Sequence, residues 1–374
     1  MTISRRILLQ CLSTGAAATV AGPWLAKLSA AGPSGRPIRL NRNENTYGPS
    51  EQAMAAMRQA LTSANRYADV ETEVLRRKIA AYHRVTPEQV VLGCGSSEVM
   101  RTAVDAFVGP AKKLMVALPT FDVMGDAALR VGAEVVAIPL KKDYSHDLEV
   151  MLERSDASTG LIYLCNPNNP TGTLTHRRDL EIFIRRLPAR ISVLIDEAYH
   201  HYVGESSDYA SFIDRPIDDD RVIVARTFSK IYGLAGLRIG YAIAAPQTSR
   251  LLAAHQLPDD LNLNVVAATA AVAALGDVDH VRVSANRNTD DRQEFFNQAN
   301  ARMLRWIDSR TNFLLLHVAR PAVDVIEYFH KHAILVGRLI PAFEKSVRVS
   351  LGTPAEMREF WRVWDMMAAR QMSM

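Results

Sequence analysis

Hydrophobic and polar positions follow two different periods along most of the chain, and each change of period predicts a new element. Short apolar runs are typical of buried strands, whereas apolar residues three and four positions apart are typical of helices with one buried face. The apolar runs predict strands at 90–92, 113–118, 134–138, 161–165, 191–196 and 222–225, and the helical patterns between them cover 99–108, 122–131 and 178–187. Strands that alternate with helices favour an α/β fold, with a mostly parallel sheet between two layers of helices.

The two ends of the chain depart from this alternation. Residues 32–50 are rich in Pro, Gly, Asn and Arg, which predicts an extended arm that leads into a helix capped by Ser50. Past Pro246 the pattern is helical to about residue 305, and strands at 312–318, 333–336 and 346–351 then mix with helices at 322–332 and 355–372. We therefore expect a large domain at 51–255 and a smaller α+β domain at 256–374.

The first residues have the character of an export signal. Arg5 and Arg6 precede a mildly apolar run at 11–26, and small residues follow at 29–31. Paired arginines, an apolar segment too short to span a bilayer and a small-residue end are typical of a twin-arginine signal. We expect cleavage after Ala31, a periplasmic protein and no membrane attachment once the signal is removed. The alternative is an amphipathic first helix in a cytoplasmic protein.

Composition narrows the class of protein further. The chain has 374 residues, 48% of them hydrophobic, and a net charge of only +4. No basic run is interleaved with aromatic residues, so nucleic acid is not an expected partner. The cysteines Cys11, Cys94 and Cys165 do not form a disulfide framework and are not at metal-ligand spacing, so no metal is expected.

Polar side chains gather after the predicted strand at 222–225. Thr227, Ser229 and Lys230 follow it, and Arg238 comes eight residues after the lysine. Open α/β sheets place their ligands at the carboxyl ends of strands, and hydroxyls with an arginine are anion ligands. The segment therefore indicates an anion site around one amine. The alternative is an ordinary strand exit with a solvated lysine.

The turn after strand 90–92 indicates a second set of anion ligands. Gly95, Ser96 and Ser97 lie between this strand and the next helix. The unpaired N–H groups and the positive dipole end of a helix face the same point in such a turn, which suits one phosphate. A dinucleotide fingerprint fails because Glu98 replaces its third glycine, and a phosphate loop fails for lack of a Gly-Lys pair. A bare turn is the alternative.

Three other strand exits also have functional groups. Phe121, Asn169 and Asp196 follow or end predicted strands, and Tyr199 lies three residues after Asp196. A buried carboxylate needs a cationic or hydrogen-bonding partner. A phosphate cup, an aromatic ring, an amide, a carboxylate, a tyrosine and a lysine together match one ligand, pyridoxal 5'-phosphate.

These motifs identify a resemblance to the fold type I aminotransferases of class I/II, and within them to the histidinol-phosphate aminotransferase group. The motifs are Asn169-Pro170-Thr171-Gly172, Asp196-Glu197-Ala198-Tyr199, and Ser229-Lys230 followed by Arg238. The similarity runs from Leu40 to about Met357. It implies a seven-stranded type of sheet in the large domain.

The resemblance also implies roles for individual residues in holding the cofactor. Lys230 resembles the lysine that forms a Schiff base with it, and Asp196 matches the acid that meets the ring nitrogen. Phe121 matches the residue stacked on the ring, while Asn169 and Tyr199 match those that hold its phenolic oxygen. The phosphate ligands would be Gly95, Ser96, Ser97, Thr227, Ser229 and Arg238.

Further roles concern the partner subunit and the substrate. Tyr67 resembles the tyrosine that reaches the phosphate of the other subunit, so the resemblance implies a homodimer. Arg348 matches the arginine that grips a substrate carboxylate or phosphate, and Arg338 is a second candidate. Three positions differ from the common pattern: Ala68 replaces a proline, Phe121 a tyrosine and Ser97 an acidic residue.

The expected activity is transfer of an amino group from an amino acid, or a related amine such as histidinol phosphate, to a 2-oxo acid. A decarboxylase, lyase or oxidase that uses the same cofactor is the first alternative. A non-catalytic exported binding protein on the same scaffold is the second. Histidine synthesis belongs in the cytoplasm, so an export signal argues against histidinol phosphate as the natural substrate.

Overall fold

A computed structural model describes residues 37–217 and 219–372, and the expected signal at 1–31 lies outside them. The chain divides into two compact units. The larger comprises Glu44–Asp290 and Asp308–Asn312. The smaller contains the described residues up to Asn43, Asp291–Ile307 and the described residues from Phe313 onward. The sequence places this division at 255 instead. It has no composition signal near 290 because helix α12 (Val278–Ala301) runs through that point without a loop.

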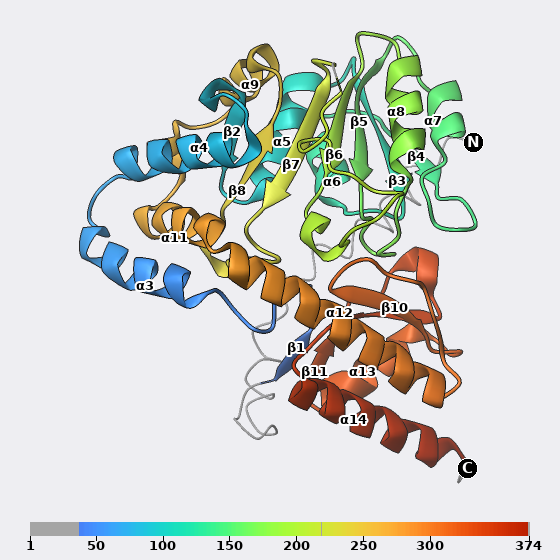
Figure 1. Ribbon diagram of the computed structural model, residues 1–374. Coiled ribbons are helices and arrows are strands. Elements are labelled where there is room, and N and C mark those ends of the chain that lie inside the picture. The colour runs from blue at the N-terminus through green and yellow to red at the C-terminus, as the bar shows by residue number, and fades with distance from the viewer. Residues whose placement is uncertain (1–36, 218, 373–374) are drawn as a thin grey trace. The chain divides into compact units, whose positions relative to one another are not determined.

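The larger unit is built on one seven-stranded sheet (Figure 1). Its order is β2-β8-β7-β6-β5-β3-β4. The strands are β2 (Val90–Gly93), β3 (Lys113–Leu118), β4 (Val135–Pro139), β5 (Thr159–Cys165), β6 (Ser192–Asp196), β7 (Val222–Thr227) and β8 (Gly240–Ile243). Neighbours from β7 to β4 are parallel, whereas β8 is antiparallel to both β7 and β2. The expected α/β class with a mostly parallel sheet is confirmed.

Helices flank this sheet on both sides in Figure 1. The helices of the larger unit are α3 (Glu51–Ala60), α4 (Asp69–His83), α5 (Ser96–Phe107), α6 (Val123–Arg130), α7 (Leu148–Glu153), α8 (Arg177–Arg186), α9 (Pro246–Ala253), α10 (Asp259–Asn262) and α11 (Val265–Gly276). Ser50 caps α3 as expected, because its hydroxyl accepts the Ala53 N–H at 3.1 Å. Helix α11 packs on α3 and α4, which explains why residues beyond 255 join the larger unit.

One core cluster of the larger unit lies between the sheet and helices α5 and α6. It joins Val99, Met100 and Val104 of α5 to strand residues such as Leu114 and Tyr163. Burial on both faces explains why these strands read as nearly continuous apolar runs. The predicted strand at 113–118 coincides with β3, and the others differ from the observed strands by one or two residues at an end. Strand β8 and helix α7 were missed because both are short and lack a clear period.

The smaller unit is an α+β structure. Its strands are β1 (Ile38–Leu40), β9 (Arg305–Trp306), β10 (Phe313–His317), β11 (Ile334–Val336) and β12 (Ser346–Ser350), and its helices beyond α12 are α13 (Ala322–Lys331) and α14 (Pro354–Met372). Strand β1, from the predicted arm, pairs in parallel with β11. No helix in the described ranges is both long and apolar enough to cross a membrane.

Candidate functional site

The parallel register of the sheet brings five chain exits to one edge of the larger unit. Strands β2, β3, β5, β6 and β7 run in the same direction, so their carboxyl ends lie at the same edge. Strand β8 runs the other way and therefore begins there, directly after Arg238. All of the predicted cofactor residues except Tyr67 belong to these exits. The fold thus collects residues that are up to 143 positions apart, from Gly95 to Arg238.

The predicted phosphate ligands surround the first turn of α5. Helix α5 begins at Ser96, and Gly95 before it has a left-handed φ of 75°. The Arg238 guanidinium lies directly against Gly95, where any Cβ would overlap it. Arg238 also donates through Nη1 to the Ser229 hydroxyl at 3.3 Å. The Arg238 guanidinium, the Ser229 hydroxyl and the N-terminus of α5 therefore lie around one point. Together they form the set of donors that a phosphate dianion requires.

Two further contacts complete this cup. The Thr227 hydroxyl accepts the Ser229 N–H at 3.1 Å, so both side chains are ordered by the loop that leads to Lys230. Ser97 lies half-buried in the first turn of α5. The Glu98 carboxylate accepts the Cys94 N–H at 2.6 Å, and this hydrogen bond fixes the turn before α5.

A Gly95→Ala substitution is expected to weaken cofactor binding. The Cβ would occupy the space of the Arg238 guanidinium, and φ of 75° is strained for any residue with a Cβ, at a cost of about 1–2 kcal/mol. We expect the dissociation constant of pyridoxal phosphate to rise about tenfold or more, measured by titration of the apoenzyme. Gly204→Ala is the matched control, because Gly204 also has a positive φ (71°) but has open space around it. An equal loss of affinity in both variants would contradict the explanation.

Asp196 ends β6 as a fully buried carboxylate. Its Oδ2 accepts the Tyr163 hydroxyl at 2.9 Å, and its Oδ1 accepts the Ala198 N–H at 3.0 Å. Burial raises the pKa of Asp196 to about 6, against these hydrogen bonds and the positive charge of Lys230. Asp196 is therefore ionised at neutral pH, and it lies close enough to Lys230 to feel its charge.

Lys230 lies above the ring of Tyr199. Its Nζ is 5.6 Å from the centre of that ring, and Tyr199 itself is buried. Next to Lys230, the Ile231 carbonyl accepts the Asn45 side-chain amide at 2.9 Å, so the arm before α3 holds this loop. The structure thus gathers Lys230, Asp196 and Tyr199 in one neighbourhood, as the sequence predicts.

Phe121 and Asn169 come from two neighbouring exits, after β3 and β5. Phe121 is half-buried and packs against the core beneath the sheet edge. Asn168 ties the two exits together, because its side chain accepts from the Thr120 hydroxyl at 2.8 Å and donates to the Pro119 carbonyl at 3.1 Å. Asn169, the next residue, is buried.

A buried ion pair that the sequence analysis missed joins β6 to β7. Arg226 Nε donates to Glu197 Oε2 at 2.9 Å, and both side chains are almost completely buried. Glu197 also accepts from the Ser211 hydroxyl and the Phe212 N–H, at 2.6 and 2.8 Å. Glu197 and Arg226 have opposite charges and each lies directly after a predicted strand. This pattern was a usable sequence signal for an ion pair, because buried charges have to pair.

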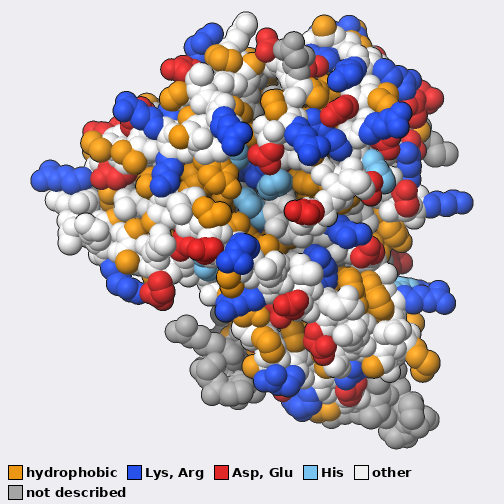
Figure 2. Space-filling model, in the orientation of Figure 1, with side chains coloured by type: hydrophobic (Ala, Val, Ile, Leu, Met, Phe, Trp, Pro, Cys, Tyr) orange, Lys and Arg blue, Asp and Glu red, His pale blue; other side chains and the backbone are white. Residues whose placement is uncertain are grey.

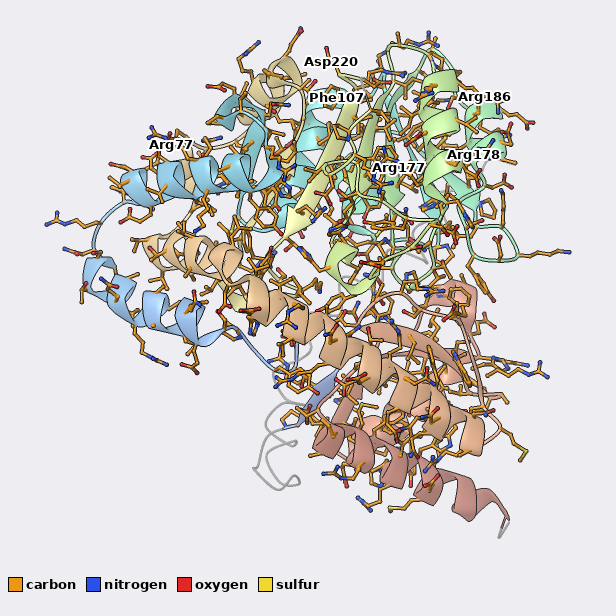
Figure 3. The ribbon with its side chains drawn as sticks, viewed as in Figure 1. Arg77, Phe107, Arg177, Arg178, Arg186 and Asp220 are labelled. Carbon is orange, nitrogen blue, oxygen red and sulfur yellow. The ribbon has the colours of Figure 1, made fainter. Side chains whose placement is uncertain are left out.

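Arg177, labelled at the start of α8 in Figure 3, holds the segment that carries Ser211. Its guanidinium lies 3.4 Å from the centre of the Phe212 ring and donates to the Ala210 and Arg215 carbonyls at 3.2 and 2.5 Å. The segment that contains Ser211 and Phe212 therefore connects the end of β6 to β7, and Arg177 holds this segment in place.

Breaking this pair is expected to destabilise the protein. Arg226→Met leaves the Glu197 carboxylate buried without its counter-charge, which costs about 3–5 kcal/mol. Urea unfolding of parent and variant measures the loss. Glu149→Gln is the control, because Glu149 pairs with Arg186 (labelled in Figure 3) where both side chains are exposed, and such pairs contribute below about 1 kcal/mol. Similar losses in the two variants would contradict the prediction.

His83, His200 and His201 lie close enough to this ion pair to feel the charge of Arg226. Figure 2 shows pale blue histidine side chains among hydrophobic ones on one face of the molecule. His83 Nε2 is 2.7 Å from the Tyr241 hydroxyl, and His200 Nδ1 is 3.1 Å from that of Tyr209. Burial lowers the pKa of all three, that of His201 to about 3, so they are neutral at neutral pH.

His200 and His201 lie in the turn η4 (His200–Tyr202), a few residues after β6, where both side chains are half-buried. No group of three or more His, Cys, Asp or Glu side chains among residues 37–217 and 219–372 has an arrangement that could hold a metal ion.

The remaining predicted residues lie elsewhere. Tyr67 is 73% exposed, in the link between α3 and α4 of the larger unit. Arg348 and Arg338 both belong to the smaller unit. There the Arg348 carbonyl accepts the Gly337 N–H at 2.8 Å, so the two arginines come from adjoining backbone, and Arg348 donates to the Asn41 carbonyl at 2.8 Å.

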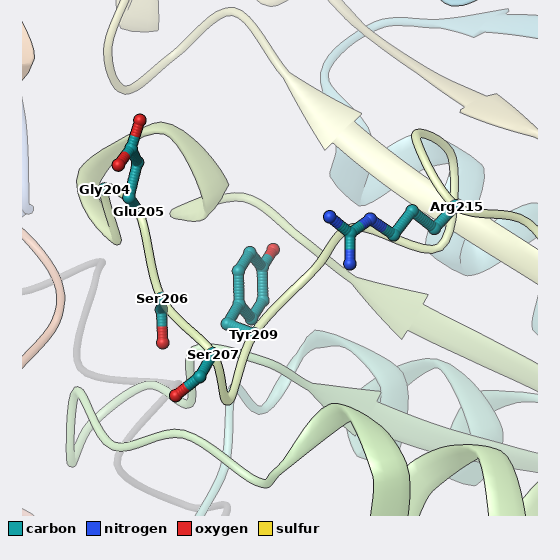
Figure 4. Close-up of a pocket in the computed structure, with 6 residues that line it drawn as sticks. All are labelled: Gly204, Glu205, Ser206, Ser207, Tyr209 and Arg215. Atoms are coloured by element: carbon teal, nitrogen blue, oxygen red, sulfur yellow. The ribbon is translucent and has the colours of Figure 1, made fainter.

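A shallow surface hollow is found on the loop after β6 (Figure 4). It is lined by Gly204, Glu205, Ser206, Ser207, Tyr209 and Arg215. None of the residues predicted to hold a cofactor lines it, so the hollow is separate from the candidate site.

The fold and the site together define the class of protein. The profile of the family "Aminotransferase class I and II" matches residues 36–363, and the chain belongs to this family. It is 36% identical to histidinol-phosphate aminotransferase 2 of Carboxydothermus hydrogenoformans, over 86% of this chain and 88% of that protein. It is 34% identical to the histidinol-phosphate aminotransferase of Bacillus subtilis, over 86% of this chain and 89% of that one.

Solved structures agree with the sequence relatives. A putative histidinol-phosphate aminotransferase from Erwinia carotovora superposes with a TM-score of 0.85 and 32% identity, covering 92% of this chain and 99% of that one. The histidinol-phosphate aminotransferase of Sinorhizobium meliloti, in complex with pyridoxal-5'-phosphate, superposes with a TM-score of 0.81 and 27% identity, covering 91% and 95%.

The protein is a pyridoxal-phosphate-dependent transaminase, which confirms the cofactor and the enzyme class expected from the sequence. The family and its relatives favour transamination over the alternative reactions and over a non-catalytic protein. The residues fit the cofactor, because the cup at Gly95 offers donors for a phosphate and Asp196 is a buried carboxylate near an amine.

Proposed function

We propose that Lys230, Asp196 and the cup around Gly95 are the cofactor site of this transaminase. The observation that carries the proposal is that Lys230 and Asp196 leave the adjacent parallel strands β7 and β6 at the same edge, within range of each other's charge. Lys230 binds the cofactor aldehyde through its amine. Gly95, Ser96, Ser97, Thr227, Ser229 and Arg238 bind its phosphate.

When bound, the cofactor supplies a protonated pyridine ring that draws electrons away from the substrate's α-carbon. Asp196 keeps that proton on the ring nitrogen, because an ionised carboxylate in a water-excluded position strongly favours a cation beside it. Phe121 would cover the ring, and Asn169 and Tyr199 would donate hydrogen bonds to its phenolic oxygen.

Lys230 also acts as the general base. With the substrate amine attached in its place, the Lys230 amine would stay tethered near the substrate's α-carbon. Its Nζ would accept the α-proton of the substrate and later donate it again, which is general base catalysis by a positioned amine. Tyr199, whose ring lies beneath Nζ, limits where that amine can move.

The acting enzyme is proposed to be a homodimer. Tyr67 is a large side chain with 73% of its surface exposed, in a short link, which suits a residue that reaches another subunit's phosphate. Sedimentation or light scattering should give twice the chain mass. A catalytically active monomer would contradict the proposal.

The amino donor is proposed to be an amino acid or a related amine, with a 2-oxo acid as acceptor. Arg348 and Arg338 are the proposed ligands for a substrate carboxylate or phosphate, because a guanidinium binds both through paired hydrogen bonds. The relatives' name supports histidinol phosphate as donor. The paired Arg5 and Arg6, with the proposed twin-arginine export to the periplasm, support a different amine.

A donor screen tests the activity directly. The reconstituted enzyme is mixed with histidinol phosphate or with an aromatic, a basic or an acidic amino acid, and a 2-oxo acid is supplied as acceptor. We expect one donor to bleach the visible absorbance of the bound cofactor and to yield the aminated acceptor. Release of carbon dioxide or ammonia, or consumption of oxygen, without an aminated acceptor would contradict transamination.

Export is tested separately. The full chain, tagged at its carboxyl end, should appear shortened in the periplasmic fraction, and replacing Arg5 and Arg6 by lysine should keep it in the cytoplasm. Full-length protein that remains cytoplasmic in both cases would contradict export.

A further inference from the structure

Tyr163 is an unusual residue for its position in the sheet. It lies in the middle of β5, is fully buried, and belongs to the same apolar cluster as Leu114, Val116 and Leu194. A tyrosine hydroxyl in such surroundings needs a hydrogen-bond partner. Its partner is the Asp196 carboxylate, at 2.9 Å from Oδ2.

The register of the sheet makes this contact specific. Residue Cys165 of β5 lies opposite Asp196 of β6, and Tyr163 lies opposite Leu194. Because side chains two positions apart share a face, Tyr163 and Cys165 both approach Asp196 from the next strand. The Cys165 thiol is 3.9 Å from the same Oδ2, which makes it a much weaker donor than the phenol.

The phenol and the backbone together hold both oxygens of the carboxylate. Tyr163 donates to Oδ2 and the Ala198 N–H donates to Oδ1, so the direction of the carboxylate is set from two sides. Both bonds favour the ionised form, while burial in the apolar cluster opposes it. Without the phenol, Asp196 would keep only one close donor in this setting.

The phenol itself remains protonated over the working range of pH. Burial, followed by the negative charge of Asp196, raises the pKa of Tyr163 well above its usual value of 10. A neutral phenol beside an ionised carboxylate can only donate. The bond therefore has one direction whenever Asp196 is charged.

We propose that Tyr163 is a positioning residue of the reaction, which holds Asp196 ionised and aimed for the cofactor's ring nitrogen. The proposal deepens the cofactor site described above and rests on it for the role of Asp196. Tyr163 itself touches neither the cofactor nor the substrate in this scheme; it acts through the carboxylate.

The test measures the titration of Asp196 in the apoenzyme, before any cofactor is added. Infrared spectra recorded across pH follow the carbonyl band of the protonated carboxyl, and the band that disappears in Asp196→Asn identifies this group. In Tyr163→Phe the midpoint is expected about one to two pH units above that of the parent, because a hydrogen bond to a charged group is lost.

Tyr241→Phe is the matched control. Tyr241 is an equally buried phenol of the same sheet, but its hydroxyl contacts His83 at 2.7 Å. Its removal should leave the midpoint of Asp196 unchanged. A folded Tyr163→Phe apoenzyme with the midpoint of the parent overturns the proposal, and so does an equal shift in both variants.

Two further measurements complete the test. If Tyr163→Phe does not fold, 3-fluorotyrosine is placed at position 163 alone; a more acidic phenol donates more strongly, so the midpoint should fall below that of the parent. No change overturns the proposal. In the holoenzyme, Tyr163→Phe should lower kcat about tenfold with little change in KM, because the substrate's own contacts are intact.

The experiment separates this proposal from the assignment of Asp196. Full turnover in Asp196→Asn would remove the carboxylate from the reaction, whereas the infrared result on the apoenzyme would still decide whether Tyr163 controls its charge.

Discussion

Replacing Lys230 with alanine is expected to lower turnover at least about 10⁴-fold while the protein still folds. The variant loses both the covalent attachment of the cofactor and the general base, and a positioned base alone contributes about 10²–10⁴ in rate. Steady-state assays with the best donor from the screen measure the loss. Circular dichroism checks the fold, which should persist because Lys230 is only half-buried.

Two control experiments test whether the loss of turnover in Lys230→Ala is due to the missing amine. Lys142→Ala removes an exposed lysine of the larger unit that is distant from Lys230 in the sequence, and it should leave kcat unchanged. A small primary amine added to Lys230→Ala should restore part of the rate, because it replaces the lost base. Turnover within tenfold of the parent would remove Lys230 from the reaction.

Asp196→Asn is expected to have opposite effects on activity and on the stability of the apoenzyme. Turnover should fall about 10²–10³-fold, the range found when one preorganised group that stabilises charge is removed from a water-excluded site. The apoenzyme should become more stable at pH 8, because the parent has to keep a buried carboxylate ionised there.

The sign of the stability effect follows from the pKa of Asp196. Burial raises it to about 6 in the folded protein, above the ordinary value of 3.8. The folded state thus holds the proton more tightly than the unfolded chain. The stability this gives is fully present below pH 3.8 and is lost as pH rises through about 6, by roughly 3 kcal/mol at most.

Chemical unfolding of the two apoenzymes at several pH values measures this dependence. Asp196→Asn should be more stable than the parent at pH 8, and the difference should shrink as pH falls through about 6. Bound cofactor should reverse the order at pH 8, since its ring cation compensates the carboxylate only in the parent. An apoenzyme variant less stable than the parent at pH 8 would contradict the prediction.

Much of the larger unit could be predicted from the chain because its strands are buried on both faces. The strand at 113–118 was predicted with its observed bounds, since the residues from Leu114 to Leu118 are all apolar and Lys113 and Pro119 mark the two ends of the run. Strand β8 was missed because Gly240–Ile243 is only four residues long and follows a loop rich in glycine. Its pairing with β2 and β7 depends on the tertiary fold and leaves no pattern in the local sequence.

The site could be predicted residue by residue where a motif contains it, but not where only contacts define it. Asp196 begins a motif directly after an apolar run, and Lys230 ends a motif five residues after another. Tyr163, Glu197 and Arg226 lie in the strands or at their ends. Their spacing in the sequence does not indicate which residue each of them contacts. Charged and polar-tipped residues in buried strands were the available signal, because each of them must be paired there.

The amino-acid sequence by itself determined the kind of fold, the cofactor and the residues at the strand exits. Those features depend on short stretches of chain, since an apolar run makes a buried strand and its exit presents whatever side chains come next. Only the tertiary structure decided that Arg238 lies against Gly95 and that a phenol in one strand donates a hydrogen bond to the carboxylate at the end of another. Such contacts depend on strand order and register, which are set by the packing of the whole unit.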